Sequence, residues 1–179
     1  MDKNPESYQW LILFILYGIA LILLSQLNQS LATVSLFLFV NGLLVSFPAL
    51  FLPLGQGIAA VFLFSIFYDS GESWNIGVSL FPNLVTFTAL YYLRDRIQYD
   101  NRRAYKMVVL IVNLILYIYY TILAGNTYGV TSQFVFLNLL HLLVSEFVLF
   151  LIAGLLISYQ KDVLRMFNID VDASLRAAK

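Results

Sequence analysis

The chain contains no cysteine and one histidine. The lack of cysteine excludes a disulfide framework, thiolate metal ligands and a thiol nucleophile, and it leaves the redox compartment open. Charged residues are also scarce. They make up 11% of the chain against about 25% in a typical soluble domain, whereas hydrophobic residues make up 61%. Residues 7–68 contain no Asp, Glu, Lys or Arg, a length sufficient for about three membrane spans of roughly 20 residues. We therefore predict an integral membrane protein.

Sequence motifs that would indicate an enzyme are missing. The chain has no glycine loop for a nucleotide, no zinc signature and no nucleophile elbow with acid and histidine partners. Its 179 residues allow one helical domain and leave no room for a separate soluble enzyme domain. We accordingly expect a protein that is not an enzyme and that holds no cofactor or metal.

Apolar segments separated by polar, glycine or proline residues predict the architecture. Backbone groups in lipid must be satisfied within a helix, so breaks belong near the interfaces or in sites lined by protein. We predict an all-α polytopic membrane protein of one domain, residues 1–179, with six transmembrane helices in one bundle. The expected spans are residues 8–24, 32–52, 57–68, 76–93, 107–124 and 132–158.

Some ends of these spans have alternatives. No small-residue cleavage pattern follows the first apolar segment, so we interpret it as a retained helix and not as a signal peptide. The segment 57–68 is short for a layer of roughly 30 Å, and it either begins earlier or is re-entrant. The tail, residues 159–179, is either a short interfacial helix or a frayed end.

Basic residues are concentrated in two places. One group follows the fourth predicted span, and the other is in the tail. These residues are Arg94, Arg96, Arg102, Arg103 and Lys106 in the loop, and Lys161, Arg165, Arg176 and Lys179 in the tail. The positive-inside rule places both groups in the cytoplasm. Six spans put both termini and this loop on one side, so charge and span number agree on cytoplasmic termini.

Two carboxylates end the long uncharged run. Asp69 and Glu72 are three residues apart and would share a helix face, where paired carboxylates bind a cation or couple protons. The alternative is a turn outside the cytoplasm, because Asp, Ser, Gly and Asn favour turns and Trp74 suits the membrane interface. We favour the turn.

Span six carries the second group of polar residues. Glu146 is an acid well inside an apolar span, so it needs a partner or a proton. His141 and Glu146 are about 140° apart on a helix, which is poor geometry for one metal ion. We expect interhelical polar contacts, with Asn41 and Asn113 as possible partners, and keep a proton or substrate pathway as the alternative. Positions 138, 141 and 145 follow helical spacing on one face, and the candidates for buried polar contacts are Asn138, His141, Ser145 and Glu146.

The central part of the chain resembles a known family. The stretch "LGQGIAAVFLFSIFYDSG", a short turn and the opening "NIGVSLFP" of the next span are similar to the rod shape-determining MreD family. In that family a glycine-bearing span ends in Asp followed by Ser-Gly, and a Leu-Gly or Ile-Gly pair starts the next helix. The matching positions here are Gly57, Asp69, Ser70, Gly71 and Gly77. Glu72, Ser73 and Trp74 enlarge the usual turn, and the tail is longer than the family pattern.

This resemblance implies a non-catalytic scaffold of the cell-elongation machinery in a bacterial inner membrane. Its implied partners are membrane lipid, the single-span protein MreC, a RodA-type peptidoglycan polymerase with its transpeptidase, and, indirectly, MreB filaments; no nucleic acid is expected. Asp69, Ser70 and Gly71 would shape an outer turn.

Two other functions remain open. One is a substrate-binding subunit of an energy-coupling-factor vitamin transporter, a family with a related fold. That family typically docks through Ala-x-x-x-Ala in span one, which is absent from "LYGIALILLS" here. The other is a proton-coupled carrier that uses Glu146, for which a lone acid without an inverted repeat is little support.

Overall fold

The structure is a computed structural model that describes residues 8–71, 75–97 and 102–170; for Arg102 it describes the backbone alone. The described residues form α-helices and a short 3₁₀ helix, and they include no strand. The elements are α1 (Gln9–Ala32), α2 (Asn41–Phe51), α3 (Leu54–Ser70), α4 (Leu80–Leu93), η2 (Arg94–Arg96), α5 (Arg102–Tyr128) and α6 (Ser132–Met166). The predicted all-helical class is confirmed for these residues.

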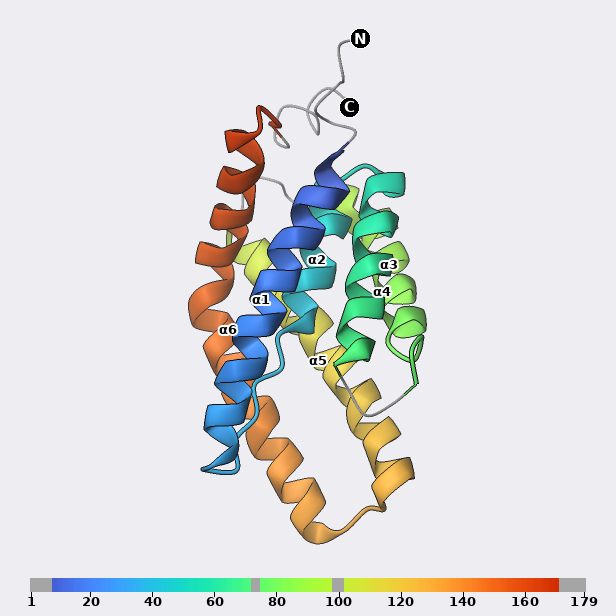
Figure 1. The fold of residues 1–179 in the computed structure, drawn as a ribbon, viewed down its shortest axis with the longest axis vertical. Helices are drawn as coiled ribbons and strands as arrows, with labels where there is room; N and C mark the ends of the chain where they lie inside the picture. The colour runs from blue at the N-terminus through green and yellow to red at the C-terminus, as the bar shows by residue number, and fades with distance from the viewer. Residues whose placement is uncertain (1–7, 72–74, 98–101, 171–179) are drawn as a thin grey trace.

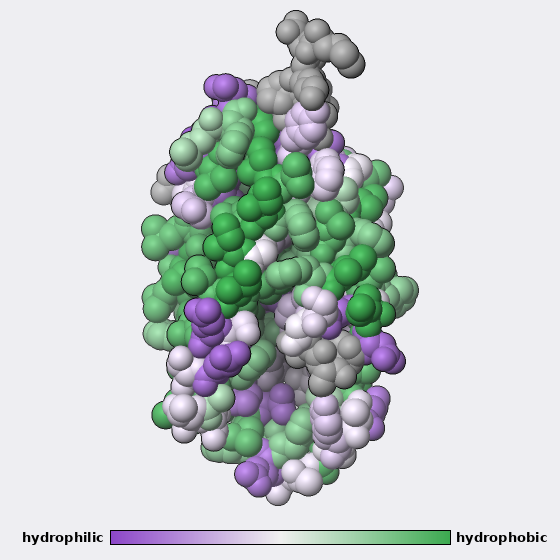
Figure 2. Space-filling model, viewed as in Figure 1, coloured by the Kyte–Doolittle hydropathy of each residue, from purple (hydrophilic) through white to green (hydrophobic). Residues whose placement is uncertain are grey.

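Three of the helices are long and apolar enough to cross a membrane, judged by length and composition. They are α1, α5 and α6, and their outward faces carry large apolar side chains such as Ile19, Ile115 and Leu155. Figure 2 shows apolar residues covering much of one face of the molecule. A continuous apolar surface is unfavourable in water and favourable in lipid. These features indicate a protein embedded in a membrane.

The short helix α2 forms the centre of the bundle. All of its residues are buried, and it packs against α3, α4 and α5. The helices α1 and α6 lie farther out, where α1 packs on α3 and α6 packs on α5 (Figure 1). A helix that is apolar all round is stable only when protein or lipid surrounds it. Pro53 disfavours helical backbone at the preceding residue, Leu52, whose ψ is 156°, so α2 and α3 are separate helices.

The segment between α1 and α2 differs from the sequence prediction. A helix was expected over residues 32–52, but α1 continues to Ala32 and helix resumes only at Asn41. Residues 33–35 form a turn, with Ser35 at a positive φ of 55°, and residues 36–40 are non-helical. In Figure 1 this segment runs from the end of α1 back into the bundle. The physical reason is tertiary: side chains of other helices bind its backbone, as described below.

The other boundaries differ less. The third helix begins earlier than predicted, at Leu54, and α6 continues to Met166, so the first part of the predicted tail is a direct extension of the last helix. The start of α1, the end of α4, the start of α5 and the end of α6 lie at one end of the bundle, and the α5–α6 connection lies at the other (Figure 1).

Candidate functional site

The non-helical segment is held by side chains from three helices, α1, α5 and α6. The side chain of Asn28 in α1 accepts a hydrogen bond from the backbone N–H of Leu38 at 2.8 Å. It also donates one to the carbonyl oxygen of Leu38 at 3.0 Å. Ser145 of α6 accepts one from the N–H of Phe39 at 2.9 Å. Backbone groups outside a helix are costly to bury unless they have such partners. These polar residues in apolar helices therefore satisfy the backbone of residues 38 and 39.

Asn113 of α5 completes this arrangement. Its Oδ1 accepts a hydrogen bond from the N–H of Gly42 at 3.0 Å, and its Nδ2 donates to the carbonyl oxygen of Phe39 and to Oε1 of Glu146, each at 3.0 Å. The residue before α2, Val40, offers no side-chain cap. Asn113 therefore caps the first turn of α2 from a neighbouring helix. Of the two partners expected for Glu146, the structure places Asn113 beside it.

A glycine allows α2 and α5 to come close enough for this contact. A Cβ atom at position 42 would overlap with the backbone and Cβ of Asn113. Gly57 of α3 has a similar role, because a Cβ there would lie 2.6 Å from the ring of Phe87. Small residues at helix contacts are typical of membrane bundles. Gly57, one of the predicted motif positions, thus lies in a helix contact.

The remaining predicted polar residues of α6 make separate contacts. Asn138 accepts a hydrogen bond from the hydroxyl of Tyr117 and donates one to the carbonyl oxygen of Phe134 in its own helix. His141 Nε2 lies 2.9 Å from the carbonyl oxygen of Ser35. Since a carbonyl oxygen only accepts, Nε2 carries the proton in this contact. His141, Ser145 and Glu146 therefore lie around the non-helical segment, and Asn138 lies apart from it.

Asp69 is buried in the last turn of α3, beside the connection to α4. Asp69 is only 1% exposed. Its carboxylate accepts hydrogen bonds from the backbone N–H of Gly77 at 2.7 Å and from that of Ser79 at 3.1 Å. Gly77 has a φ of +102°, which favours glycine. Ser79 precedes α4, where backbone N–H groups and the helix dipole favour a negative charge.

The two residues that follow Asp69, Ser70 and Gly71, are exposed. Ser70 donates a hydrogen bond to the carbonyl oxygen of Phe67, and Gly71 follows the end of α3. Glu72, the second predicted carboxylate, lies outside the described residues, as do Ser73 and Trp74.

The basic residues of the predicted cytoplasmic loop have different surroundings. Arg94 donates a hydrogen bond of 3.0 Å to the carbonyl oxygen of Leu52, at the end of α2, and its guanidinium lies 4.0 Å from the centre of the Tyr91 ring. The Lys106 ammonium lies 5.6 Å from the ring centre of Phe150. Arg96 and Arg103 are exposed, and the Arg102 side chain lies outside the described residues. Arg94 therefore also stabilises the α2–α3 connection.

Sequence reasoning missed one buried pair. The hydroxyl of Tyr17 in α1 donates a hydrogen bond of 3.2 Å to Oε1 of Gln160 in α6. Gln160 falls in the predicted tail, so its sequence context indicated a site outside the bundle. A tyrosine in an apolar helix is also typical of the membrane interface, so nothing in the sequence indicated a buried partner for Tyr17.

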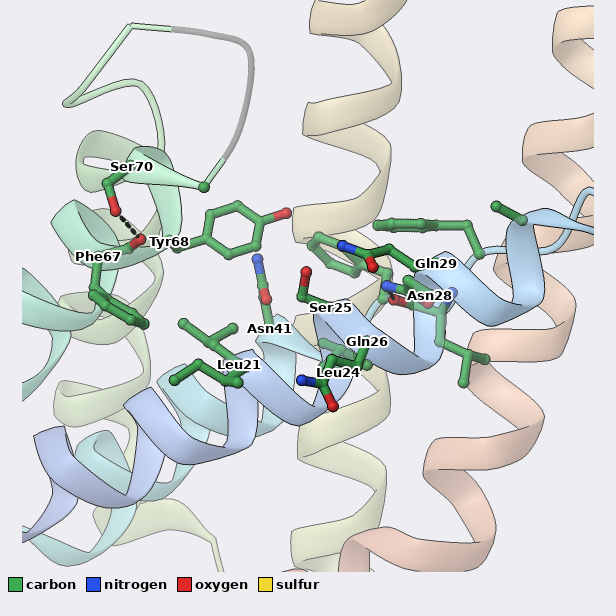
Figure 3. Close-up of a pocket in the computed structure, with 16 residues that line it drawn as sticks. Leu21, Leu24, Ser25, Gln26, Asn28, Gln29, Asn41, Phe67, Tyr68 and Ser70 are labelled. Carbon is green, nitrogen blue, oxygen red and sulfur yellow. Dashed lines mark hydrogen bonds between the residues drawn. The ribbon is translucent and has the colours of Figure 1, made fainter.

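A cavity of about 660 Å³ lies between the second half of α1, the non-helical segment and the end of α3 (Figure 3). Its lining combines aromatic side chains with neutral polar ones. Asn41, at the start of α2, is 1% exposed, and neither atom of its amide group has a hydrogen-bond partner. The structure thus does not use Asn41 as the partner of Glu146.

The described residues contain no group of three or more His, Cys, Asp or Glu side chains that could hold a metal ion. The candidate functional features are therefore the buried carboxylate of Asp69, the polar contacts around Asn113, and the cavity beside Asn41. A comparison of the chain with family models, curated proteins and solved structures finds no match to any of them.

Proposed function

We propose that this chain is a non-catalytic membrane scaffold of the MreD type, which binds a single-span MreC-like protein and regulates peptidoglycan synthesis during cell elongation. The observation that carries the proposal is the hydrogen bond between Asp69 and Gly77. These residues belong to the two halves of the resemblance, the Asp-Ser-Gly end of one helix and the glycine that opens the next. Their contact gives both halves one structural purpose, which is to tie the end of α3 to the segment before α4.

The proposal includes six membrane spans. The helix α2 has 11 residues, about 17 Å at about 1.5 Å per residue, which is too short alone for a layer of about 30 Å. The non-helical residues 36–40 add about 16 Å at about 3.3 Å each. Together they are long enough to cross. Their polar contacts with Asn28, Asn113 and Ser145 make a non-helical stretch tolerable inside a membrane.

The proposed orientation follows from charge. Arg94, Arg103 and Lys106 lie in or beside the segment between α4 and α5, at the end of the bundle where α1 begins and α6 ends (Figure 1). We place this end in the cytoplasm of a bacterial inner membrane by the positive-inside rule. Asp69 and the α5–α6 connection then lie at the outer face.

The scaffold role rests on helix faces and not on chemistry. Asn113, Ser145 and Glu146 bind backbone groups or each other inside the bundle, and this use explains them without a reaction. Helix faces with apolar side chains, such as those of α1 and α6, suit the single helix of a partner. A RodA-type polymerase, its transpeptidase and, indirectly, MreB filaments would join through that partner.

The test is a pull-down of the tagged chain from native membranes in mild detergent, with mass spectrometry of everything that co-purifies. Recovery of a single-span coiled-coil protein with peptidoglycan synthases supports the scaffold. Recovery of a paired-ATPase module with a coupling membrane subunit would contradict the scaffold proposal and favour the vitamin-transporter hypothesis. Glu146→Gln is the matched variant: a scaffold keeps the same partners, because glutamine retains an oxygen that accepts from Asn113.

A further inference from the structure

The cavity beside Asn41 has no part in the scaffold role. It is bounded by Leu21 and Ser25 of α1, by Phe39 of the non-helical segment and by Tyr68 near the end of α3. Figure 3 shows the side chains of Ser25, Asn41 and Tyr68 pointing toward the same space. We propose that this cavity is a binding site for an uncharged ring compound that carries an amide group, anchored by the Asn41 side chain.

The size of the cavity fits a small molecule. Its volume of about 660 Å³ falls within the roughly 300–1,000 Å³ of typical ligand sites. Such sites are mostly apolar, with a few convergent polar groups that orient the ligand. The lining follows this pattern, with leucines and aromatic residues beside the side chains of Ser25, Asn28 and Asn41.

The lining determines the charge of the ligand. None of the lining residues is Asp, Glu, Lys or Arg. An ion that entered this space would lose water without gaining an opposite charge, which is strongly unfavourable. A neutral ligand with hydrogen-bonding groups avoids this loss, so we assign the cavity to uncharged molecules.

The amide of Asn41 determines the functional group. Its Oδ1 and Nδ2 are buried and have no hydrogen-bond partner, and a buried polar group without a hydrogen bond is unfavourable. In Figure 3 the amide group points toward Tyr68, away from the axis of α2. An amide presents one acceptor and one donor side by side. The matching partner is another amide, whose N–H and C=O pair with both atoms at once.

A second asparagine at the cavity shows why Asn41 is the anchor. Asn28 also lines the cavity, but its Oδ1 and Nδ2 are both bound to the backbone of Leu38 and hold the wall in place. Asn41 makes no such contact with the wall. The amide groups of the two residues thus have different roles, one structural and one available to a ligand.

Aromatic side chains favour a flat ligand. Phe37, Phe39, Phe67 and Tyr68 lie along the cavity and come from two separate parts of the chain. Rings in such positions stack on or meet the edge of a ligand ring. A carboxamide on an aromatic ring therefore combines the group that Asn41 requires with the body that these walls accept.

The experiment uses nicotinamide as the probe and nicotinate, its charged counterpart, as the control. Saturation-transfer difference NMR is measured on the full chain in detergent micelles at equal probe concentrations. We expect saturation transfer to nicotinamide, little transfer to nicotinate, and binding of nicotinamide about fivefold weaker in Asn41→Leu, the effect of losing about 1 kcal/mol of hydrogen bonding. Gln133→Leu, which changes an exposed amide outside the cavity, should bind nicotinamide like the wild type.

Several results would overturn the assignment. They are equal transfer to both probes, no transfer to nicotinamide, unchanged binding in Asn41→Leu, or a co-purified phospholipid that nicotinamide does not displace. The comparison of the two probes needs no variant, so it decides the assignment even where Asn41→Leu fails to fold. Asn41→Ala provides a smaller replacement of the same amide.

Discussion

Asn113 of α5 and Glu146 of α6 are joined by a hydrogen bond of 3.0 Å, and the same asparagine binds the backbone on both sides of the start of α2. Glu146 is thus part of a contact that fixes a helix end. An acid in an apolar span usually indicates a proton or substrate path. Here Asn113 links Glu146 to the backbone of the non-helical segment, so Glu146 has a structural role.

Removal of Asn113 should destabilise the bundle. Asn113→Leu leaves the N–H of Gly42, the carbonyl of Phe39 and the side chain of Glu146 without this partner. We expect a loss of about 2–4 kcal/mol in the free energy of unfolding, since each unsatisfied buried group costs about 1–3 kcal/mol and the effects overlap. Unfolding in detergent measures it. Thr127→Val, which removes a hydrogen bond within one exposed helix turn, is the control and should change little.

Two glycines make a matched pair for helix packing. Gly42→Ala places a methyl group against the backbone of Asn113, which forces α2 and α5 apart. We expect a loss of about 1–3 kcal/mol in the free energy of unfolding. Gly55→Ala, where nothing lies within 4 Å of the new Cβ, should be neutral or stabilising. Equal stability of the two variants would contradict the close approach of α2 and α5.

The buried carboxylate of Asp69 predicts an order of effects among its variants. Asp69→Asn keeps an oxygen that accepts from Gly77 or Ser79, so we expect a mild loss of about 1 kcal/mol or less. Asp69→Leu removes the acceptor for both N–H groups, and we expect about 2–4 kcal/mol. Thermal unfolding and abundance in membranes measure this order. Abolished function of a well-folded Asp69→Asn protein would instead assign chemistry to the carboxylate.

Glu146→Gln tests the alternative of proton coupling. Glutamine keeps an acceptor for Asn113 but does not exchange a proton with a substrate path. We expect normal folding, normal abundance and complementation of a deletion strain at the wild-type level. Loss of function at normal abundance would favour a proton-coupled carrier.

Composition and hydropathy were sufficient for the helical class and for the apolar character of α1, α5 and α6. They failed at residues 36–40, because an apolar run is compatible with either a helix or a buried extended segment. The choice depends on Ser145 and Asn113, which lie far away in the chain. Only the folded bundle brings these side chains to the backbone of Phe39.

Only part of the candidate site could be predicted, because local sequence patterns indicate turns and polar residues but not which distant residues meet. Asp69 was expected in a turn because of its neighbours Ser70 and Gly71, and Asn113 was among the partners considered for Glu146. The cavity was not foreseen, since it arises where the end of α1 meets the non-helical segment and α3. No local pattern distinguishes Asn41, which has no partner, from Asn28, which has two.

The central proposal is that the helical bundle crosses a membrane six times, with Asp69 and the α5–α6 connection outside. The chain has no cysteine, so single cysteines report position without background. The most direct measurement is labelling of Val130→Cys, in the α5–α6 connection, and Asp162→Cys, near the end of α6, with an impermeant thiol reagent in intact cells. We predict that position 130 is labelled and that position 162 is labelled only after permeabilisation. Labelling of both in intact cells, or the reverse pattern, would contradict the six-span topology.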